Sequence, residues 1–304
     1  MHMESQINVK SLGDVLQNRL DRIINDAANE CIRTGFSIID EVYGGLHKSQ
    51  VIILTSRPGE GKTSFMLNLA VNISKEGNVP VAIFSTAVSA GHLASVILQQ
   101  QCGVPTYKFR NASKLLMEDL ESLTGAISSI KSVPLFFEDT PCPRIEDLVN
   151  KIHNLVANYG VKVIFIDDLQ SMENPYSSAF CDKNALFFQI LKHLADELGI
   201  TFIVLSSLKK FGNRKPCYKD LERSSLSYDT LDGYVDLVAA IYRTDWAGVT
   251  DSGCNTAQLL VLHNKHGRRD ISFDLTFDFD TNSFKDIQDP DPDPEFTDNN
   301  SLRI

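Results

Sequence analysis

Several features that would indicate a secreted, membrane-bound or metal-binding protein are missing from this sequence of 304 residues. No stretch approaches the roughly 20 apolar residues that a membrane-spanning helix needs, and the N-terminal segment MHMESQINVKSLGDVL has no apolar signal core. The six cysteines form no C-x-x-C pair and have no histidine at zinc-binding spacing. These absences predict a soluble, cytoplasmic protein with reduced thiols and no metal cluster.

The chain also lacks the excess of positive charge that is usual in proteins that coat duplex nucleic acid, since its formal net charge is −10. Two local basic runs remain, KKFGNRK at 209–215 and HNKHGRR at 263–269. Taken alone, each run is most simply a solvated loop. A local basic loop in an acidic protein can nevertheless hold phosphates, so both interpretations stay open.

What the sequence does have is a long alternation of short apolar runs and helical stretches. Strands are predicted at 51–55, 81–85, 135–137, 163–166, 202–205 and 237–242, and helices at about 63–76, 89–101, 115–130, 145–158 and 184–198. Uninterrupted apolar strands suit burial on both faces. The pattern therefore predicts an α/β fold with a mostly parallel central sheet flanked by helices. The later runs AQLLVLHNK, ISFDLTFD and NSFKDI predict antiparallel edge strands.

The two ends of the chain differ from this middle region in residue pattern and composition. Residues 10–30 carry apolar residues at helical spacing, so we expect an amphipathic helix whose apolar stripe packs on its own domain or on a neighbouring subunit. The terminal run DPDPDPEFTDNNSLRI is rich in aspartate and proline and is predicted to be disordered. The predicted organisation is a linker helix at 1–32, one domain at 33–287 and an acidic tail at 288–304.

The strongest motif is VIILTSRPGEGKTSF at 51–65, in which a buried strand leads through a glycine-bearing loop into a helix. That context is the one a phosphate-binding P-loop requires. Glycines let backbone N–H groups turn toward phosphate, the lysine attracts the outer phosphates, and the helix N-terminus favours an anion. Ser56 replaces the usual first glycine. The predicted ATP-binding residues are Arg57, Pro58, Gly59, Glu60, Gly61, Lys62, Thr63 and Ser64.

A second apolar strand, in VKVIFIDDLQSM at 161–172, ends in Asp167 and Asp168. An aspartate at the end of a strand parallel to the P-loop strand suits the magnesium ion that accompanies ATP. We therefore predict a Mg²⁺ site at Thr63 and Asp167. Asp168 is a candidate catalytic carboxylate, and a helix cap is the structural alternative.

With these motifs placed, the span from about Thr34 to Ile287 resembles the RecA-like motor domain of the DnaB-type hexameric replicative helicases. The similar segments, in order, are TGFSIIDEVYGGL, SRPGEGKTSF, FIDDLQSM, LKHLADELGITFIVLSSL, KDLERSS and VDLVAAIYRTD. The resemblance implies a ring of six subunits with ATP–Mg²⁺ between neighbours and single-stranded DNA in the channel. Other replication proteins are possible partners, and the lack of a long apolar stretch predicts no membrane partner. The linker helix and AIYRTD disfavour a RecA- or KaiC-like ATPase of another branch.

The resemblance also implies that two loops, at about 170–184 and 209–225, face DNA. Its candidate DNA-binding residues are Lys209, Lys210, Arg214, Lys215 and Arg223. Where the family commonly has Asp-Leu-Arg-Glu-Ser-Gly, this chain has DLERSS at 220–225, so the charged pair is inverted and the glycine is missing.

Three departures from the family pattern concern hydrolysis. Ala87 stands at the position of the catalytic glutamate, Ser207 at that of a γ-phosphate-sensing glutamine, and Lys265 at that of the arginine finger. A lysine keeps the charge of an arginine but loses its planar fork. Two hypotheses follow: an ATP-driven DNA helicase with altered catalytic groups, in which Lys62, Thr63, Asp167, Asp168 and Lys265 act, or a helicase-like pseudoenzyme that binds ATP and serves as a scaffold, loader or regulator.

Overall fold

The computed structural model describes residues 11–14, 16–17, 20, 31–86, 88–109, 111–140, 144–168, 183–209, 214–224, 228–243 and 256–287. Several predictions lie outside these residues: most of the helix at 10–30, nearly all of the loop at 170–184, and the tail from 288. Ala87 and Lys210 lie outside them as well.

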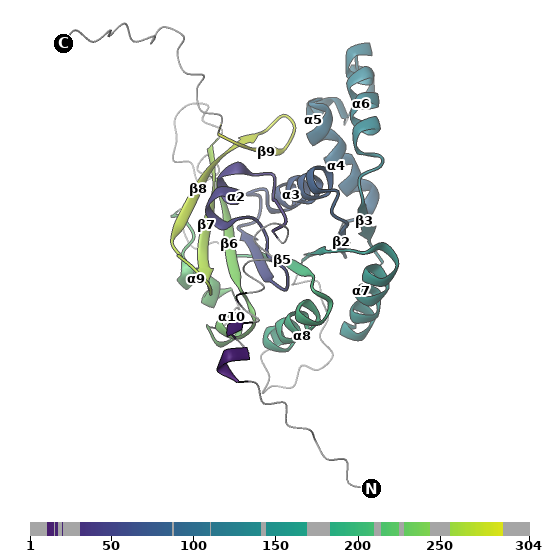
Figure 1. Ribbon diagram of the computed structural model, residues 1–304. Coiled ribbons are helices and arrows are strands. Elements are labelled where there is room, and N and C mark those ends of the chain that lie inside the picture. Colours follow the sequence, from purple (N-terminus) through teal and green to yellow (C-terminus); the bar gives the residue numbers. More distant parts are fainter. Residues whose placement is uncertain are drawn as a thin grey trace, which may run out of the picture.

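One nine-stranded sheet organises the described part of the chain, with strand order β3-β2-β4-β5-β1-β6-β7-β8-β9 (Figure 1). Its parallel strands are β1 (Val51–Ser56), β2 (Val81–Ser85), β3 (Leu135–Glu138), β4 (Val163–Asp167), β5 (Thr201–Ser207) and β6 (Leu237–Arg243). The antiparallel edge consists of β7 (Thr256–Asn264), β8 (Ile271–Asp278) and β9 (Ser283–Asp286). The predicted mostly parallel sheet with an antiparallel extension is confirmed.

Helices cover both faces of this sheet. The described helices are α2 (Ser37–Tyr43), α3 (Lys62–Gly77), α4 (Ala90–Cys102), α5 (Thr106–Phe109), α6 (Met117–Ile130), α7 (Ile145–Tyr159), α8 (Lys183–Leu198), α9 (Tyr218–Arg223) and α10 (Tyr228–Tyr234), with a 3₁₀ turn at Ala112–Lys114. The five longest, α3, α4, α6, α7 and α8, match the predicted stretches within about two residues. Helices α2, α5, α9 and α10 were not predicted, because none exceeds seven residues and so none completes two helical turns.

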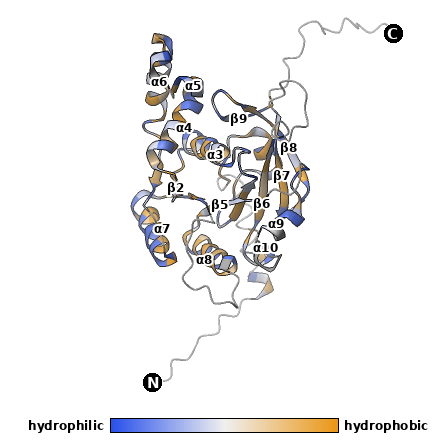
Figure 2. Ribbon diagram, turned by 180° about the vertical axis from the view of Figure 1, so that it is seen from behind, coloured by the Kyte–Doolittle hydropathy of each residue, from blue (hydrophilic) through white to orange (hydrophobic). Residues whose placement is uncertain are grey.

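Successive residues of the central strand β1 supply two separate apolar cores. Val51 and Ile53 pack on the side of α7 and α8, whereas Ile52 and Leu54 pack on the side of α3 and α4. Figure 2 shows the central strands as predominantly apolar. A strand buried on both faces needs no polar alternation, which is why β1, β2 and β4 are continuous apolar runs in the sequence and are buried along their whole length.

Only fragments of the predicted N-terminal helix belong to the described residues, and these fragments, at 12–14, 16–17 and 20, are helical. Three of their leucines, Leu12, Leu16 and Leu20, are 74%, 57% and 49% exposed. Among the described residues, no helix is long and apolar enough to cross a membrane.

Candidate functional site

The P-loop turn connects the end of β1 to the start of α3. Gly59 and Gly61 adopt φ angles of 87° and 93°, a left-handed region that side chains with a Cβ rarely enter. A Cβ on Gly61 would also lie only 2.9 Å from Cζ of Phe284 in β9. Gly61 is therefore required both by the backbone turn and by the packing beneath it, and α3 begins directly afterwards at Lys62.

Lys62 lies at the mouth of this turn, and its ammonium donates a hydrogen bond to Oγ of Ser207 at 2.9 Å. Burial lowers the pKa of Lys62, against an opposing effect of Asp167 and Asp168. Ser207 ends β5, the strand beside β1, so the residue at the sensing position does reach the P-loop. A half-buried ammonium held by a neutral hydroxyl is well suited to meet a phosphate oxygen.

Thr63 and Asp167 face each other across the same end of the sheet, with Thr63 Oγ1 3.4 Å from Asp167 Oδ2. Burial raises the pKa of Asp167, although Lys62 lowers it. Hydroxyl and carboxylate oxygens are the protein ligands that Mg²⁺ prefers. These two residues thus fit a magnesium ion, and the glycine turn with Lys62 fits the phosphates that would accompany it. Asp168 follows directly and is half-buried.

Arg57 and Glu60 form a buried pair within the P-loop. The Arg57 backbone N–H donates to Glu60 Oε2 at 3.0 Å, and the guanidinium lies 3.8 Å from Oε1. The same guanidinium donates to the backbone carbonyl of Arg214 and lies 5.9 Å from the ring centre of Tyr242. The Glu60 carboxylate is therefore engaged within the loop itself, by the backbone and the guanidinium of Arg57.

The segment after β2 approaches the magnesium-side aspartate. Ser85 pairs with Asp167 in the parallel register of β2 and β4, and the backbone N–H of Thr86 donates to the Asp167 carbonyl at 3.3 Å. The neighbouring Ala87 lies outside the described residues. The resemblance nevertheless assigned the glutamate position to a segment that does adjoin the site.

An aromatic stack beside the P-loop was missed by the sequence reasoning. The guanidinium of Arg243, at the end of β6, lies 4.0 Å and 4.5 Å from the ring centres of Phe277 and Phe279. Phe277 also lies 3.7 Å from the position of a Cβ on Gly61. Nothing in the local spacing of these residues indicates the stack, because β7 separates β6 from β8 in the sheet.

The predicted DNA-binding residues are only partly described. Lys209 and Lys215 are exposed, whereas Lys210 and the side chain of Arg223 lie outside the described residues. Arg214 is already engaged, since its guanidinium donates to Asp220 Oδ1 and Oδ2 at 2.6 Å and 3.0 Å. Burial alone would raise the pKa of Asp220. The hydrogen bonds from the Cys217 backbone N–H and the Arg214 guanidinium lower it by more, so the net pKa shift is downward.

Lys265 lies at the opposite end of the sheet from Lys62. Its backbone N–H donates to the carbonyl of Asp236, whose own N–H donates to Val51 at the start of β1. Lys62 follows the other end of β1, about 17 Å away at ~3.3 Å per strand residue. Lys265 therefore cannot act on a nucleotide bound by its own chain. His263, two residues before Lys265, is buried, and burial lowers its pKa.

A glycine turn, a half-buried lysine and a threonine–aspartate pair, gathered at the carboxyl ends of parallel strands, define a P-loop domain of the RecA-like class. Residues 31–286 match the model of the DnaB-like helicase C-terminal domain. The chain belongs to this family, which confirms the resemblance drawn from its motifs.

Known helicases and helicase structures are similar to the chain over most of its length. It is 30% identical over 268 residues to the replicative DNA helicase DnaB of Geobacillus stearothermophilus, covering 85% of this chain and 58% of that protein. It is 28% identical over 242 residues to the replicative DNA helicase DnaC of Bacillus subtilis, covering 78% and 52%. The chain thus spans little more than half the length of these relatives.

Two solved structures have the same fold. One, described as an ATPase domain, superposes with a TM-score of 0.80 at 21% identity, covering 92% of this chain and all of that one. The other, a DnaB-like replicative helicase described together with its interactions with primase, has a TM-score of 0.78 at 20% identity and covers 92% and 68%.

Proposed function

We propose that this chain is a cytoplasmic, ring-forming member of its helicase family that binds ATP–Mg²⁺ between subunits and single-stranded DNA in the channel. The observation that carries the proposal is the cluster of Lys62, Thr63 and Asp167 beside the glycine turn. Its side chains have the charge and ligand chemistry for a magnesium-bound triphosphate. When bound, that ion would neutralise phosphate charge, and Lys62 would exchange Ser207 for a phosphate oxygen.

The aromatic stack supports the rest of the nucleotide. Phe279 is half exposed and adjoins Phe277, whose ring lies beside the P-loop glycine. The exposed ring of Phe279, backed by the buried guanidinium of Arg243, offers a surface on which a purine base can stack. Phosphates and base would then lie on two sides of the same turn.

DNA binding is supported by the loop that follows β5. Lys209 and Lys215 are exposed in this loop, and Arg57 of the P-loop donates to the carbonyl of Arg214 within it. Exposed lysines provide a phosphate-tracking surface without sequence preference. In this proposal Lys210 and Arg223 add to that surface, while Arg214 orders the loop through Asp220.

Assembly is supported by two exposed apolar surfaces. The first consists of Leu12, Leu16 and Leu20 on the N-terminal helix. The second lies on and beside α6, and its members are Tyr107, Leu116, Met117, Leu120 and Ile127. Exposed leucines at helical spacing need an apolar partner, so we propose that the N-terminal helix of one copy packs on α6 of the next. Other replication proteins remain proposed partners.

Hydrolysis is the point on which two functions diverge. A translocating helicase needs a carboxylate to orient water, and Asp168 is the candidate in this chain. A non-hydrolysing scaffold, loader or regulator is favoured by Ala87, Ser207 and Lys265, since a missing finger alone costs roughly 10³-fold or more in turnover. We propose slow hydrolysis, with binding retained.

The deciding experiment measures ATP binding and steady-state ATP hydrolysis on one sample, with and without single-stranded DNA. Lys62→Ala is the binding control and should weaken ATP by about 10- to 150-fold, the range of one charge-assisted hydrogen bond. Binding without turnover, and a gain in Ala87→Glu, would establish the scaffold function. Robust DNA-stimulated turnover that Asp168→Asn abolishes would establish the helicase function. Failure to bind ATP would reject both.

A further inference from the structure

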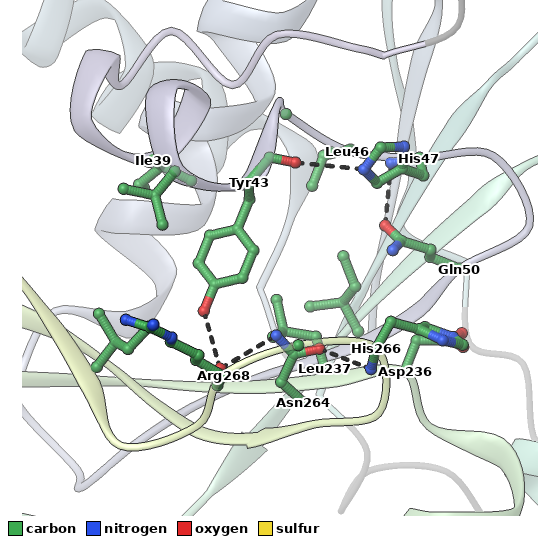
Figure 3. Close-up of a pocket in the computed structure, with 15 residues that line it drawn as sticks. Ile39, Tyr43, Leu46, His47, Gln50, Asp236, Leu237, Asn264, His266 and Arg268 are labelled. Carbon is green, nitrogen blue, oxygen red and sulfur yellow. Dashed lines mark hydrogen bonds and ion pairs between the residues drawn. The ribbon is translucent and has the colours of Figure 1, made fainter. Parts of the chain in front are cut away.

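The turn between β7 and β8, residues 265–270, carries further positive charges besides Lys265, the residue at the arginine-finger position. It carries Lys265, Arg268 and Arg269, all of which are exposed. A cleft of about 440 Å³ on one side of the turn is lined by Asp232, His263, Asn264, Lys265, Gly267 and Arg269. Arg268 instead lines a different cavity, of about 350 Å³, together with Tyr43 and Ile39 (Figure 3). The two adjacent arginines therefore lie on opposite sides of the turn.

Several hydrogen bonds hold the turn in place. The carbonyl of Arg268 accepts from the Tyr43 hydroxyl at 3.4 Å and from Asn264 Nδ2 at 3.2 Å. His266 Nε2 lies 3.2 Å from the buried carboxylate of Asp236, which Lys192 also contacts at 2.9 Å. Figure 3 shows the contacts of Arg268 and His266 around the cavity beneath the turn. These hydrogen bonds fix the backbone of the turn, which places Arg268 and Arg269 on opposite sides of it.

Lys265 and Arg269 are the two cations that line the cleft of about 440 Å³, and Arg269 is the better donor to a phosphate. Lys265 Nζ is 3.4 Å from the Gly233 carbonyl, which turns it toward its own chain. Arg269 is 65% exposed and lies 4.0 Å from the carboxylate of Asp270, itself 77% exposed, so this pair is weak. A guanidinium offers two parallel donors to a phosphate, which the ammonium of Lys265 does not.

The charges around the cleft favour an anion. Lys265 and Arg269 contribute two positive charges, and Asp232, which is 45% exposed, contributes one negative charge. His263 is buried with its Nε2 lacking a hydrogen-bond partner, and burial lowers its pKa, so it adds no charge at neutral pH. The lining groups therefore carry one net positive charge, at the end of the sheet that the chain's own nucleotide cannot reach. Asp270 lies 4.0 Å from Arg269 but outside this lining, and because both side chains are well exposed it offsets that charge only weakly.

We infer that Arg269 is the guanidinium donor to the phosphates of the nucleotide held by the adjacent copy of this chain, in place of the arginine that is absent at 265. Lys265 assists as a second positive charge. The inference rests on the proposed assembly with nucleotide between neighbouring subunits. It adds a residue that lies beyond the finger motif in the sequence and assigns different roles to two consecutive arginines.

The test compares Arg269→Ala with Arg268→Ala, which removes the same charge one residue away, on the full chain. Sedimentation velocity measures the concentration of a non-hydrolysable ATP analogue that gives half-maximal assembly. Arg269→Ala should raise this concentration by at least about 10-fold, whereas Arg268→Ala should change it less than about 2-fold. Arg269→Lys should recover only part of the loss. Analogue affinity below the assembly concentration should be unchanged in both variants.

Mixing two variants tests whether the contact crosses between subunits. Lys62→Ala subunits hold nucleotide about 10- to 150-fold more weakly but retain Arg269, and Arg269→Ala subunits hold nucleotide normally but lack the donor. An equimolar mixture should therefore assemble more readily than either variant alone. No gain in the mixture, or equal effects of the two arginine variants, would overturn the inference while leaving the proposed function intact. A loss of DNA affinity without a change in assembly would assign Arg269 to DNA instead. If the unmodified chain neither binds the analogue nor assembles with it, the proposed function and this inference both fail.

Discussion

At the scale of single residues, the candidate site contains charges that burial disfavours. Burial lowers the pKa of Lys62 and raises that of Asp167, so the charged form of each group is less stable here than in water. A bound magnesium ion and a phosphate group would supply favourable partners for both. The charges of Lys62 and Asp167 therefore favour ligand binding but lower the stability of the nucleotide-free protein.

Asp167→Asn should stabilise the nucleotide-free protein at neutral pH. The folded-state pKa of Asp167 lies above its ordinary value of 3.8, so the stability cost of its charge is absent below that pH and grows as the pH rises through the folded-state pKa. Thermal unfolding over an acid-to-neutral series should show a gain for the variant at neutral pH that disappears toward acid. Stabilisation by Mg–ATP should be lost in the same variant. A lower unfolding midpoint at neutral pH would contradict this account.

The buried pair of Arg57 and Glu60 makes a second prediction at this scale. Glu60→Gln should cost about 3 kcal/mol of unfolding free energy, because it leaves the Arg57 guanidinium buried without its carboxylate. Replacing both residues, by Arg57→Met with Glu60→Gln, should recover part of that loss, and Arg57→Met alone supplies the remaining corner of the cycle. A double-mutant cycle in urea measures the coupling. Simple additivity of the single changes would show that the pair does not act as a unit.

At the scale of elements, the terminal strand β9 supports the P-loop from below. Phe284 is buried, contacts the rings of Phe65 and Phe277, and lies against Gly61. The loop is thus held by a strand more than 200 positions later in the chain. The conformation of the phosphate-binding turn depends on the packing of the sheet edge as well as on its own glycines.

Phe284→Ala should lower the unfolding free energy by about 3–5 kcal/mol, as expected for a large aromatic side chain removed from a core. It should also weaken ATP binding, because the turn at Gly61 loses its support. Phe273→Ala is the matched control, since Phe273 is equally buried but packs against Tyr43. The control should lose similar stability and retain its ATP affinity, measured by titration well below the unfolding temperature. Equal ATP affinities in the two variants would contradict the supporting role of β9.

At the scale of the whole molecule, the exposed leucines of the N-terminal helix are expected to drive assembly. Replacing Leu12, Leu16 and Leu20 by serine should weaken self-association at least about 100-fold, because a buried leucine contributes about 1.5–3 kcal/mol. Sedimentation equilibrium measures the change. ATP binding by the dilute protein should be unaffected.

A control for this prediction removes other exposed apolar side chains. Ile38→Ser with Val42→Ser alters α2, where both residues are exposed, without touching the N-terminal helix. This pair should leave assembly nearly unchanged. An equal loss in the control would indicate nonspecific hydrophobic association, and the α6 surface would then lose its proposed occupant.

The sequence by itself determined the sheet, the long helices and the P-loop motif. Their signals are local: β1 and β4 are buried on both faces and so are apolar throughout, and the glycine spacing at 59 and 61 reflects a turn of a few residues. Asp167 could be placed because a strand end is visible in the sequence. The short helices α2, α9 and α10 were not predicted, because a helix of six or seven residues is too short to show a helical periodicity of apolar residues.

Only the tertiary structure decided which distant residues meet. The hydrogen bond from Lys62 to Ser207, the stack of Arg243 on Phe277 and Phe279, and the support of Gly61 by Phe284 all depend on strand order and register. So does the separation of Lys265 from Lys62, which follows from β7 running antiparallel to β6. Local patterns record what one segment buries, whereas these contacts arise from how separate segments lie beside one another in the sheet.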